Sequence, residues 1–334
     1  MTSFSSADPN AYLALGMQSA QGTPQTTLAK LRFAKYLKGN QFNITPAVVD
    51  IREGGDGLNF GTSYKSRMTV DGTLTVYLRP EIAGQFFQFL PGGATWSGAS
   101  APAVHTFHDN HASFPYGTMI INHPGSSIQH LFSDMRFLDY SLVGRVGQPW
   151  QLTSRFRAII FGASAAALTP TYFNLAASYQ DNLFLWHGNP SYVIDGFGDS
   201  TIEQVTLNGQ HGTDDIQAQS ILLDDIAYLN RVLDVEIMRR YQSPSMWQKV
   251  AYSGVTNVAP TTSVPTGSLN LNCFQASMVM NIAMGMLTYR YDNLTELDPD
   301  GQTVKETVSA RALHTATSQV TITLSNNHAS VYGP

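Results

Sequence analysis

Three histidines at intervals of three residues form the only ligand-rich cluster of the sequence: His105, His108 and His111, with Asp109 between them. Imidazole and carboxylate groups are common metal ligands. This spacing would place the histidines on one helix face, but the segment does not have a helical pattern of apolar residues. We therefore interpret them as ordinary loop or core histidines, and we expect no metal site.

Other short motifs that suggest chemistry are incomplete. Asp298-Pro299-Asp300-Gly301 lacks the third acid and the closing glutamate of a calcium loop, so we interpret it as a turn. Gly55-Asp56-Gly57 does not complete a dinucleotide fingerprint, because the third glycine comes one position late. The carboxylate pairs Asp214-Asp215 and Asp224-Asp225 are strand neighbours, whose side chains point to opposite faces and cannot share a proton. We expect no catalytic residue, no cofactor and no enzyme activity.

The composition favours a protein that assembles into oligomers over one that binds nucleic acid tightly. Charged residues make up 13% of the 334 residues, about half of the usual share, and charge is depleted at interfaces. The formal net charge is -5 and no basic run is longer than Arg239-Arg240, which argues against binding by phosphate neutralisation. Cys273 is the single cysteine, and we expect a small buried hydrophobe there. Without a long apolar run or a signal-peptide pattern, we expect no membrane contact and folding in a cytoplasm.

The stretch from Arg67 to Gly93 predicts a strand that leads directly into a short amphipathic helix. Pro80 suits the first helical turn, and Pro91-Gly92-Gly93 ends the helix. Asp71-Gly72 is compatible with a two-residue hairpin or with a bulge at Gly72 in one long strand, and we favour the bulge because Thr266-Gly267 lacks the aspartate. The apolar residues follow a period of two and then of four: Leu74, Val76, Leu78, Ile82, Phe86, Leu90.

A similar segment occurs about two hundred residues later, from Thr266 to Leu287. Its residues Gly267-Ser268-Leu269-Asn270-Leu271 match Gly72-Thr73-Leu74-Thr75-Val76 in type, so Gly267 would also stand at a bulge. We therefore predict an internal duplication with a second strand followed by a second helix. The second helix would present these apolar residues: Met278, Val279, Ile282, Ala283, Met286.

Alternating apolar residues and turn residues predict strands in much of the remaining chain. Residues 1–40 and 94–103 are polar, and we expect an arm and a loop there. The long segment 243–264, with its prolines, serines and threonines, also predicts a loop. Strands are expected at 43–53, 117–122, in a hairpin over 135–161, as a strand pair within 216–238, and at 319–325.

The order of these elements resembles the major tail tube protein of long-tailed bacteriophages, in the form in which one chain carries two copies of the tube fold. The likeness covers Leu13 to Leu324, apart from residues 166–210. It is carried by the Gly22-Thr23 turn, the VDGTLTVYLRPEIAGQFFQFLPGG unit, His105 with Phe107 before the Thr118 strand, SILLDDIAYLNRVLDVEIMRR and PTGSLNLNCF.

The resemblance implies a mainly β fold of two tandem antiparallel β-sandwich or barrel domains, each flanked by a short α-helix. The domains would span 41–165 and 166–334, after an N-terminal arm at 1–40. Residues 166–210 would be an insertion on the outside of the tube or part of a long loop between rings. The fold-defining and assembly residues would be Gly72, Leu74, Val76, Ile82, Phe86, Gly267, Leu269, Leu271, Met278 and Ile282.

The resemblance also implies a structural virion protein that self-assembles in the host bacterial cytoplasm and ends in the viral tail. Homotrimeric, pseudo-hexameric rings would stack into a conduit for DNA ejection. The partners would be further copies of the chain, a tape-measure protein, and tail tip and terminator proteins. Viral DNA would pass through a net negative lumen without specific binding. Candidate lining residues are Glu53, Asp71, Asp139, Asp224, Asp225, Asp234 and Glu236.

Two other functions are compatible with the sequence. A carbohydrate- or receptor-binding β-sandwich of a tail fibre or adhesin would use exposed tryptophans as stacking platforms, and it would require several of them in one cleft. The candidates for that role are Trp96, Trp150, Trp186 and Trp247. A metalloenzyme would be built around His105 to His111, and it would require stoichiometric metal.

Overall fold

The computed structural model places most of the chain in antiparallel strands, with two short helices among the residues that it describes. The helices are α1 (Pro80–Phe89) and α3 (Ser245–Tyr252). The predicted mainly β, antiparallel fold class is confirmed. The structure describes residues 12–27, 30–53, 60–91, 94–97, 101–109, 114–123, 128–164, 183–186, 191–195, 197–198, 201–218, 220–253, 262–275, 277–295, 304–315, 318–328 and 332–333.

The strands of the described chain form one connected network of pairings. In the first half they are β1 (Tyr12–Met17), β2 (Arg32–Ala34), β3 (Gln41–Ile51), β4 (Thr62–Tyr77), β5 (Ala94–Ser97), β6 (Ala103–His108), β7 (Gly117–His123), β8 (Ile128–Arg145), β9 (Gln151–Ala158) and β10 (Ile160–Ser164). In the second half they are β11 (Ser191–Ile194), β12 (Phe197–Gly198), β13 (Ile202–Ile216), β14 (Asp225–Arg240), β15 (Thr266–Gln275), β16 (Met278–Thr295), β17 (Lys305–Ala312) and β18 (Thr321–Asn326).

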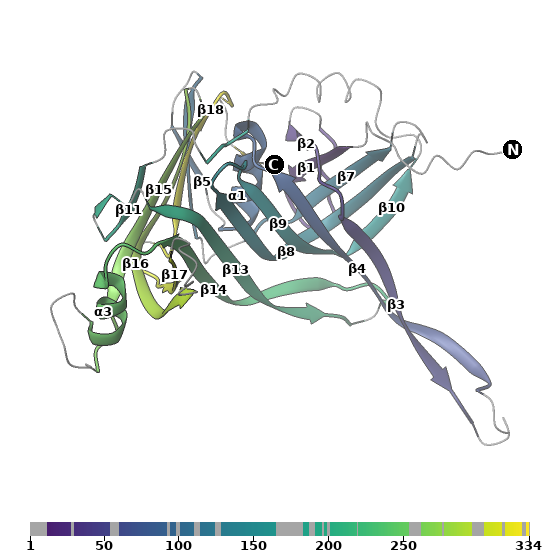
Figure 1. Cartoon of the computed structure of the whole chain (residues 1–334). Coiled ribbons are helices and arrows are strands. Elements are labelled where there is room, and N and C mark those ends of the chain that lie inside the picture. Colours follow the sequence, from purple (N-terminus) through teal and green to yellow (C-terminus); the bar gives the residue numbers. More distant parts are fainter. Residues whose placement is uncertain are drawn as a thin grey trace, which may run out of the picture.

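Eight of these strands form a continuous antiparallel sheet that crosses the molecule (Figure 1). Their order across this central sheet is β3–β4–β9–β8–β13–β14–β17–β16. The strands β8 and β16 continue beyond it. The first part of β8 pairs with β7 and β10, and the first part of β16 pairs with β15 and β18. These outer strands and α1 cover the apolar face of the central sheet, and the main core lies between them.

Helix α1 fills the centre of the first half. Pro80 stands at the start of the helix, where its missing N–H costs no hydrogen bond. Ile82 and Phe86 are fully buried, and the Phe86 ring meets the Phe137 ring of β8 edge-on at a centroid distance of 6.2 Å. The predicted strand-then-helix unit is therefore confirmed. Its two predicted core positions in β4 are also buried: Leu74, Val76.

The prediction of a helix after the strand that begins at Thr266 is wrong. Residues 278–286 belong to β16, where every second side chain from Met278 to Met284 is buried, Ile282 among them. An alternation of two also produces apolar residues four apart, so the pattern fits a strand as well as a helix. The second helix is α3, within the segment 243–264 that the sequence predicts to be a loop. The predicted core positions of β15 are buried: Leu269, Leu271.

Gly72 and Gly267 do not occupy corresponding places, although their sequence contexts match. Gly72 pairs in regular register with Phe42 and Phe156, so the bulge expected there is wrong. Glycine is needed because an added Cβ would lie 2.3 Å from Phe156 Cζ. Gly267 does stand at a register shift between β15 and β16, which confirms its bulge. The matching shift of the first half is at Gly117, between β7 and β8.

The two halves of the chain share one order of elements. Apart from β5 and β6, which follow α1, the order β3, β4, α1, β7, β8, β9 recurs later as β13, β14, α3, β15, β16, β17. We call β3–β4–β9–β8 block 1 and β13–β14–β17–β16 block 2, since the two groups have the same pairing order. An ion pair marks corresponding positions in both: Asp71 lies opposite Arg157, and Asp234 lies opposite Arg311. Residues in register with these pairs correspond between the blocks.

The structure differs from the sequence-based expectation in four further places. Strands β1 and β2 lie within 1–40, the expected arm, and β1 pairs with β2 and β7. Strand β5 lies within the expected loop 94–103. Strand β13 begins within 166–210, the expected insertion, and β14 is one strand where two are expected. Polar residues and glycines at paired positions conceal β13, because pairing uses only the backbone, whereas β1 is largely apolar and is too short to show a clear period.

Candidate assembly surface

The histidine cluster does not form a metal site in the described chain. His105 is buried in β6, and its Nε2 lies 2.8 Å from the carbonyl oxygen of His328, to which it donates. Burial lowers the pKa of His105, which disfavours the protonated ring. Among the described residues, no group of three His, Cys, Asp or Glu side chains is arranged to hold a metal ion. His111, the turn 298–301 and Gly55-Asp56-Gly57 lie outside the described residues.

The paired carboxylates also do not share a site. Asp214 is exposed, whereas Asp215 forms ion pairs with arginines of block 1. Asp224 accepts a hydrogen bond from the backbone of Ala218. Asp225 accepts one from the Tyr116 hydroxyl at 2.6 Å. Each carboxylate thus has its own surroundings.

The described tryptophans and the cysteine are mostly structural. The rings of Trp150 and Trp186 are buried and stack at a centroid distance of 5.9 Å. Trp247 is 42% exposed on α3, and the side chain of Trp96 lies outside the described residues. The described tryptophans therefore do not form a shared exposed cleft. Cys273 is buried, and burial raises the pKa of its thiol to about 12, which disfavours the reactive thiolate.

The polar face of the central sheet carries carboxylates that are matched by arginines. Strand registers place Asp71, Asp139 and Asp234 on one face, together with the arginines of β9 and β17. Their carboxylates lie 2.6–2.7 Å from guanidinium nitrogens. The partners are, in order, Arg157, Arg155 and Arg311. Three of the predicted acidic lining residues are thus neutralised in pairs.

The pairing of β8 with β13, which we call the seam, joins block 1 to block 2. It runs without a break from Gln204 opposite Arg145 to Gln210 opposite Asp139. On its core side the ring of Tyr140 covers Gly209, where an added Cβ would lie 2.0 Å from the ring. The seam is thus closed on the core side by an aromatic ring that needs the glycine.

A buried histidine stands at the end of the seam. His211 Nδ1 donates to the Phe137 carbonyl oxygen at 3.1 Å. Burial, assisted by Arg231, lowers the pKa of His211 to about 4. Burial also raises the pKa of Tyr140 to about 12. Both shifts follow from the burial of the core side of the seam, where His211 is 6% exposed.

The tip of the β13–β14 hairpin lies against block 1. Asp215 contacts Arg67 and Arg157, the latter at 2.5 Å. Burial acts to lower the pKa of Arg157, but the hydrogen bonds to Asp71 and Asp215 raise it overall. A small apolar cluster completes the contact: Leu138, Ile159, Leu223, Ile226. The seam is thus supported by a second contact between the blocks.

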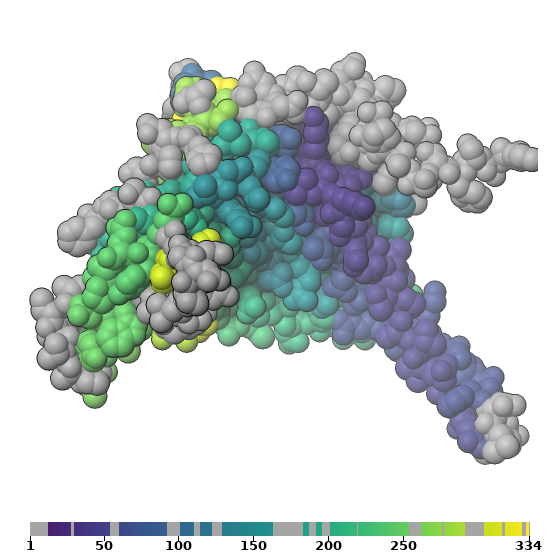
Figure 2. Space-filling model, in the orientation of Figure 1, coloured from purple at the N-terminus to yellow at the C-terminus, as the bar shows by residue number. Residues whose placement is uncertain are grey.

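Both outer edges of the central sheet are open among the described residues. Strand β3 pairs only with β4, and the last part of β16 pairs only with β17. The β3–β4 hairpin extends away from the body of the molecule (Figure 1), and Figure 2 shows it as a narrow purple projection. Its apolar side chains are exposed, with Ile44 at 44% and Val48 at 54%. Exposed strand edges of this kind are templates for pairing with another strand.

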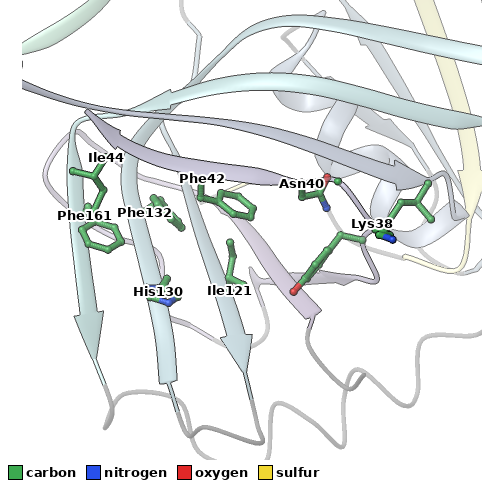
Figure 3. Close-up of a pocket in the computed structure, with 11 residues that line it drawn as sticks. Lys38, Asn40, Phe42, Ile44, Ile121, His130, Phe132 and Phe161 are labelled. Carbon is green, nitrogen blue, oxygen red and sulfur yellow. The ribbon is translucent and has the colours of Figure 1, made fainter. Parts of the chain in front are cut away.

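An aromatic groove of about 480 Å³ lies beside the open edge of β3 (Figure 3). The Phe132 ring lies between those of Phe42 and Phe161, with centroid distances of 5.5 and 5.4 Å. In block 2 the residue that corresponds to Phe42 is Leu207, which is 2% exposed next to the seam. The groove is lined by Tyr36, Leu37, Lys38, Gly39, Asn40, Phe42, Ile44, Ile121, His130, Phe132 and Phe161.

No helix within the described ranges is long and apolar enough to span a membrane. No family model matches the chain, and a search of curated proteins finds no match.

Proposed function

We propose that the chain is a ring-forming structural subunit, a tail tube protein of a long-tailed bacteriophage. One observation carries the proposal. A seam inside the chain joins two blocks of equal strand order, and the same two kinds of edge stay open at the ends of the sheet. Block 1 meets block 2 through β8 and β13, and the corresponding strands at the open ends are β16 and β3.

A second copy of the chain fits these edges. When β16 of one copy pairs with β3 of the next, the central sheet continues and each contact repeats the internal seam. Such a head-to-tail contact closes into a ring when the rotation per copy divides a full turn. Closure leaves neither outer edge of the central sheet exposed, and the neighbour's strand would cover the aromatic groove beside Phe42. Three copies, each with two blocks, would give the pseudo-hexameric ring that the family resemblance implies.

The composition and the ion pairs agree with a conduit for DNA. The polar face of the central sheet would line the lumen, and the rings would stack in the viral tail after assembly in the host cytoplasm. The guanidinium groups of Arg157 and Arg311 are held by carboxylates, so they are poor sites for phosphate. Viral DNA would pass without specific binding. The tape-measure, tail tip and terminator proteins would be the remaining partners.

Negative-stain electron microscopy of the concentrated chain tests the proposal. We expect annuli or hollow tubes with threefold or sixfold symmetry. A chain that stays monomeric up to its solubility limit would overturn the assignment to a self-assembling ring.

A cysteine pair tests the pairing of β16 with β3. Asn43 pairs with Asp71 and Asn208 pairs with Asp234, so Asn43 and Asn208 correspond. Asn208 lies opposite Ser141 in the seam. The register shift between Phe137 and Asp139 in β8 corresponds to the shift between Tyr289 and Tyr291 in β16. Two residues further along each strand, Ser141 therefore corresponds to Asn293.

The variant Asn43→Cys with Asn293→Cys should form disulfide-linked oligomers on mild oxidation. The matched control is Asn43→Cys with Asp292→Cys, which moves one thiol by a single residue to the opposite strand face. Equal cross-linking of both variants would reject this register. Buried Cys273 should not react in either variant.

A further inference from the structure

An aspartate on each long hairpin occupies the same place in its block. Asp215 lies seven residues after Asn208, and Asp50 lies seven residues after Asn43. Both hairpins contain a register shift before this position, and beyond it the residues pair at the same spacing in both. Asp215 is therefore the counterpart of Asp50.

The surroundings of the two aspartates differ. Asp215 is held by Arg67 and Arg157 of block 1. Asp50 is exposed on the projecting hairpin, where its carboxylate accepts a hydrogen bond from Ser63 at 2.5 Å. Within the described chain, Asp50 thus lacks the arginine contact that its counterpart makes.

An arginine of block 2 shows the complementary difference. Arg157 bridges two carboxylates, Asp71 at 2.7 Å and Asp215 at 2.5 Å. Arg311 is its counterpart, since it lies opposite Asp234 as Arg157 lies opposite Asp71. Among the described residues, the guanidinium of Arg311 contacts only the Asp234 carboxylate, at 2.6 and 2.9 Å, and the side chain is 33% exposed.

We propose that Asp50 of one copy forms an ion pair with Arg311 of the neighbouring copy. This contact rests on the proposed ring. If β16 and β3 join as β8 and β13 do, the β3–β4 hairpin lies across the neighbour's block 2 in the way that the β13–β14 hairpin lies across block 1. That placement brings Asp50 to the position that Asp215 occupies against Arg157. The second ligand of Arg311 is then supplied by the neighbour.

An apolar residue on the same hairpin supports this placement. Phe60 precedes the first residue of β4 by two positions, and Leu223 precedes the first residue of β14 by two. Leu223 is 3% exposed because it packs on block 1, whereas Phe60 is 67% exposed. A large exposed phenylalanine at this place is explained when the hairpin lies against another copy. The partner of the hairpin is therefore a second copy of this chain.

Charge reversal tests the ion pair without breaking the pair inside the chain. Asp50→Arg would face Arg311 of the neighbour, so we expect the concentration for half-assembly to rise about tenfold. The double variant Asp234→Arg with Arg311→Asp keeps an internal pair of opposite sign but places an aspartate against Asp50. It should assemble as poorly as Asp50→Arg. The triple variant with all three changes restores both pairs and should assemble nearly as well as wild type.

The control is Asp214→Asn, which removes an exposed carboxylate next to Asp215 on the opposite strand face. It should leave assembly unchanged. Assembly is measured by light scattering at low ionic strength, where ion pairs are least screened, with thermal unfolding to verify that each variant is folded. Two results would refute this contact alone. In the first, the Asp50→Arg variant assembles as well as wild type. In the second, the triple variant folds but assembles no better than Asp50→Arg. A wild-type chain that forms no rings would refute the proposed function, and the contact with it.

Discussion

Acidification should weaken the folded chain through His211, the buried histidine at the end of the seam. The side chain is 6% exposed, and its ring lies among those of Phe114, Tyr140 and Tyr228 at centroid distances of 5.3, 6.4 and 5.0 Å. Burial, with a smaller contribution from Arg231, lowers the pKa of His211 from 6.5 to about 4. The folded state therefore resists protonation of this ring.

The direction of the effect follows from proton linkage. Between pH 4 and 6.5 the unfolded chain binds a proton that the folded chain excludes, so the free energy of unfolding rises with pH in this window. The contribution of His211 is complete above pH 6.5 and is lost as the pH falls towards 4. The slope approaches about 1.4 kcal/mol per pH unit, which amounts to about 2 kcal/mol between pH 7 and pH 5.

Urea unfolding of wild type and His211→Gln at the two pH values isolates this contribution. Glutamine can still donate to the Phe137 carbonyl, but it does not titrate. Wild type should lose about 2 kcal/mol more than the variant on going from pH 7 to pH 5. Other groups with shifted pKa, such as His105, cancel in this difference. Parallel losses in the two proteins would refute the assignment of this pH dependence to His211.

Two further predictions concern core positions. Gly72→Val should lower the free energy of unfolding by about 1–3 kcal/mol, because its Cβ would meet Phe156 at 2.3 Å and the Gln41 carbonyl at 2.9 Å. Thermal unfolding measures this loss. Gly267→Val should be similarly destabilising, since its Cβ would lie 1.9 Å from the Asp195 carboxylate, and wild-type stability of both variants would show that neither glycine is needed. Cys273 should not react with a thiol reagent in the native chain at pH 8 but should react fully in denaturant; rapid native labelling would contradict a pKa of about 12.

The sequence predicts the strand-then-helix unit β4–α1 and strand β9 well, because these elements have distinct periods. The unit around Leu74 and Ile82 alternates by two and then by four, and β9 alternates throughout. In β13 the period is concealed. Its buried positions include Gly209, which makes room for the Tyr140 ring, and His211, which is satisfied by a backbone carbonyl. Neither residue type signals burial in a sequence.

The sequence places the second copy of the repeat at the wrong strands for a related reason. The sequence GSLNL resembles the segment at Gly72, yet the strand registers relate it to the segment at Gly117. Both glycines precede an apolar strand, and a match of five residues does not distinguish them. The true counterpart of β4 is β14, which shares its pairing but little of its sequence. Repeats of strand pairing thus persist where side-chain similarity does not, since backbone hydrogen bonds are common to all residues.

The candidate assembly surface could be predicted only in part. The low charge content indicates interfaces, and the acids at Asp71, Asp139 and Asp234 can be named from the sequence. Their arginine partners cannot, because each pair joins residues that the chain brings together only through strand pairing. The open edges and the groove beside Phe42 are likewise properties of the folded sheet.

The ion pairs change the expected reason for free passage of DNA through the proposed tube. A lumen that is acidic overall would repel phosphates over several ångströms. Here a phosphate that approached Arg157 would have to displace Asp71 or Asp215, which already lie within 2.7 Å of the guanidinium. Replacing one charge-assisted hydrogen bond by another of the same kind yields little net free energy. Paired charges can therefore keep the lining from retaining DNA without a net negative charge, which accords with a chain whose formal charge is only -5 over 334 residues.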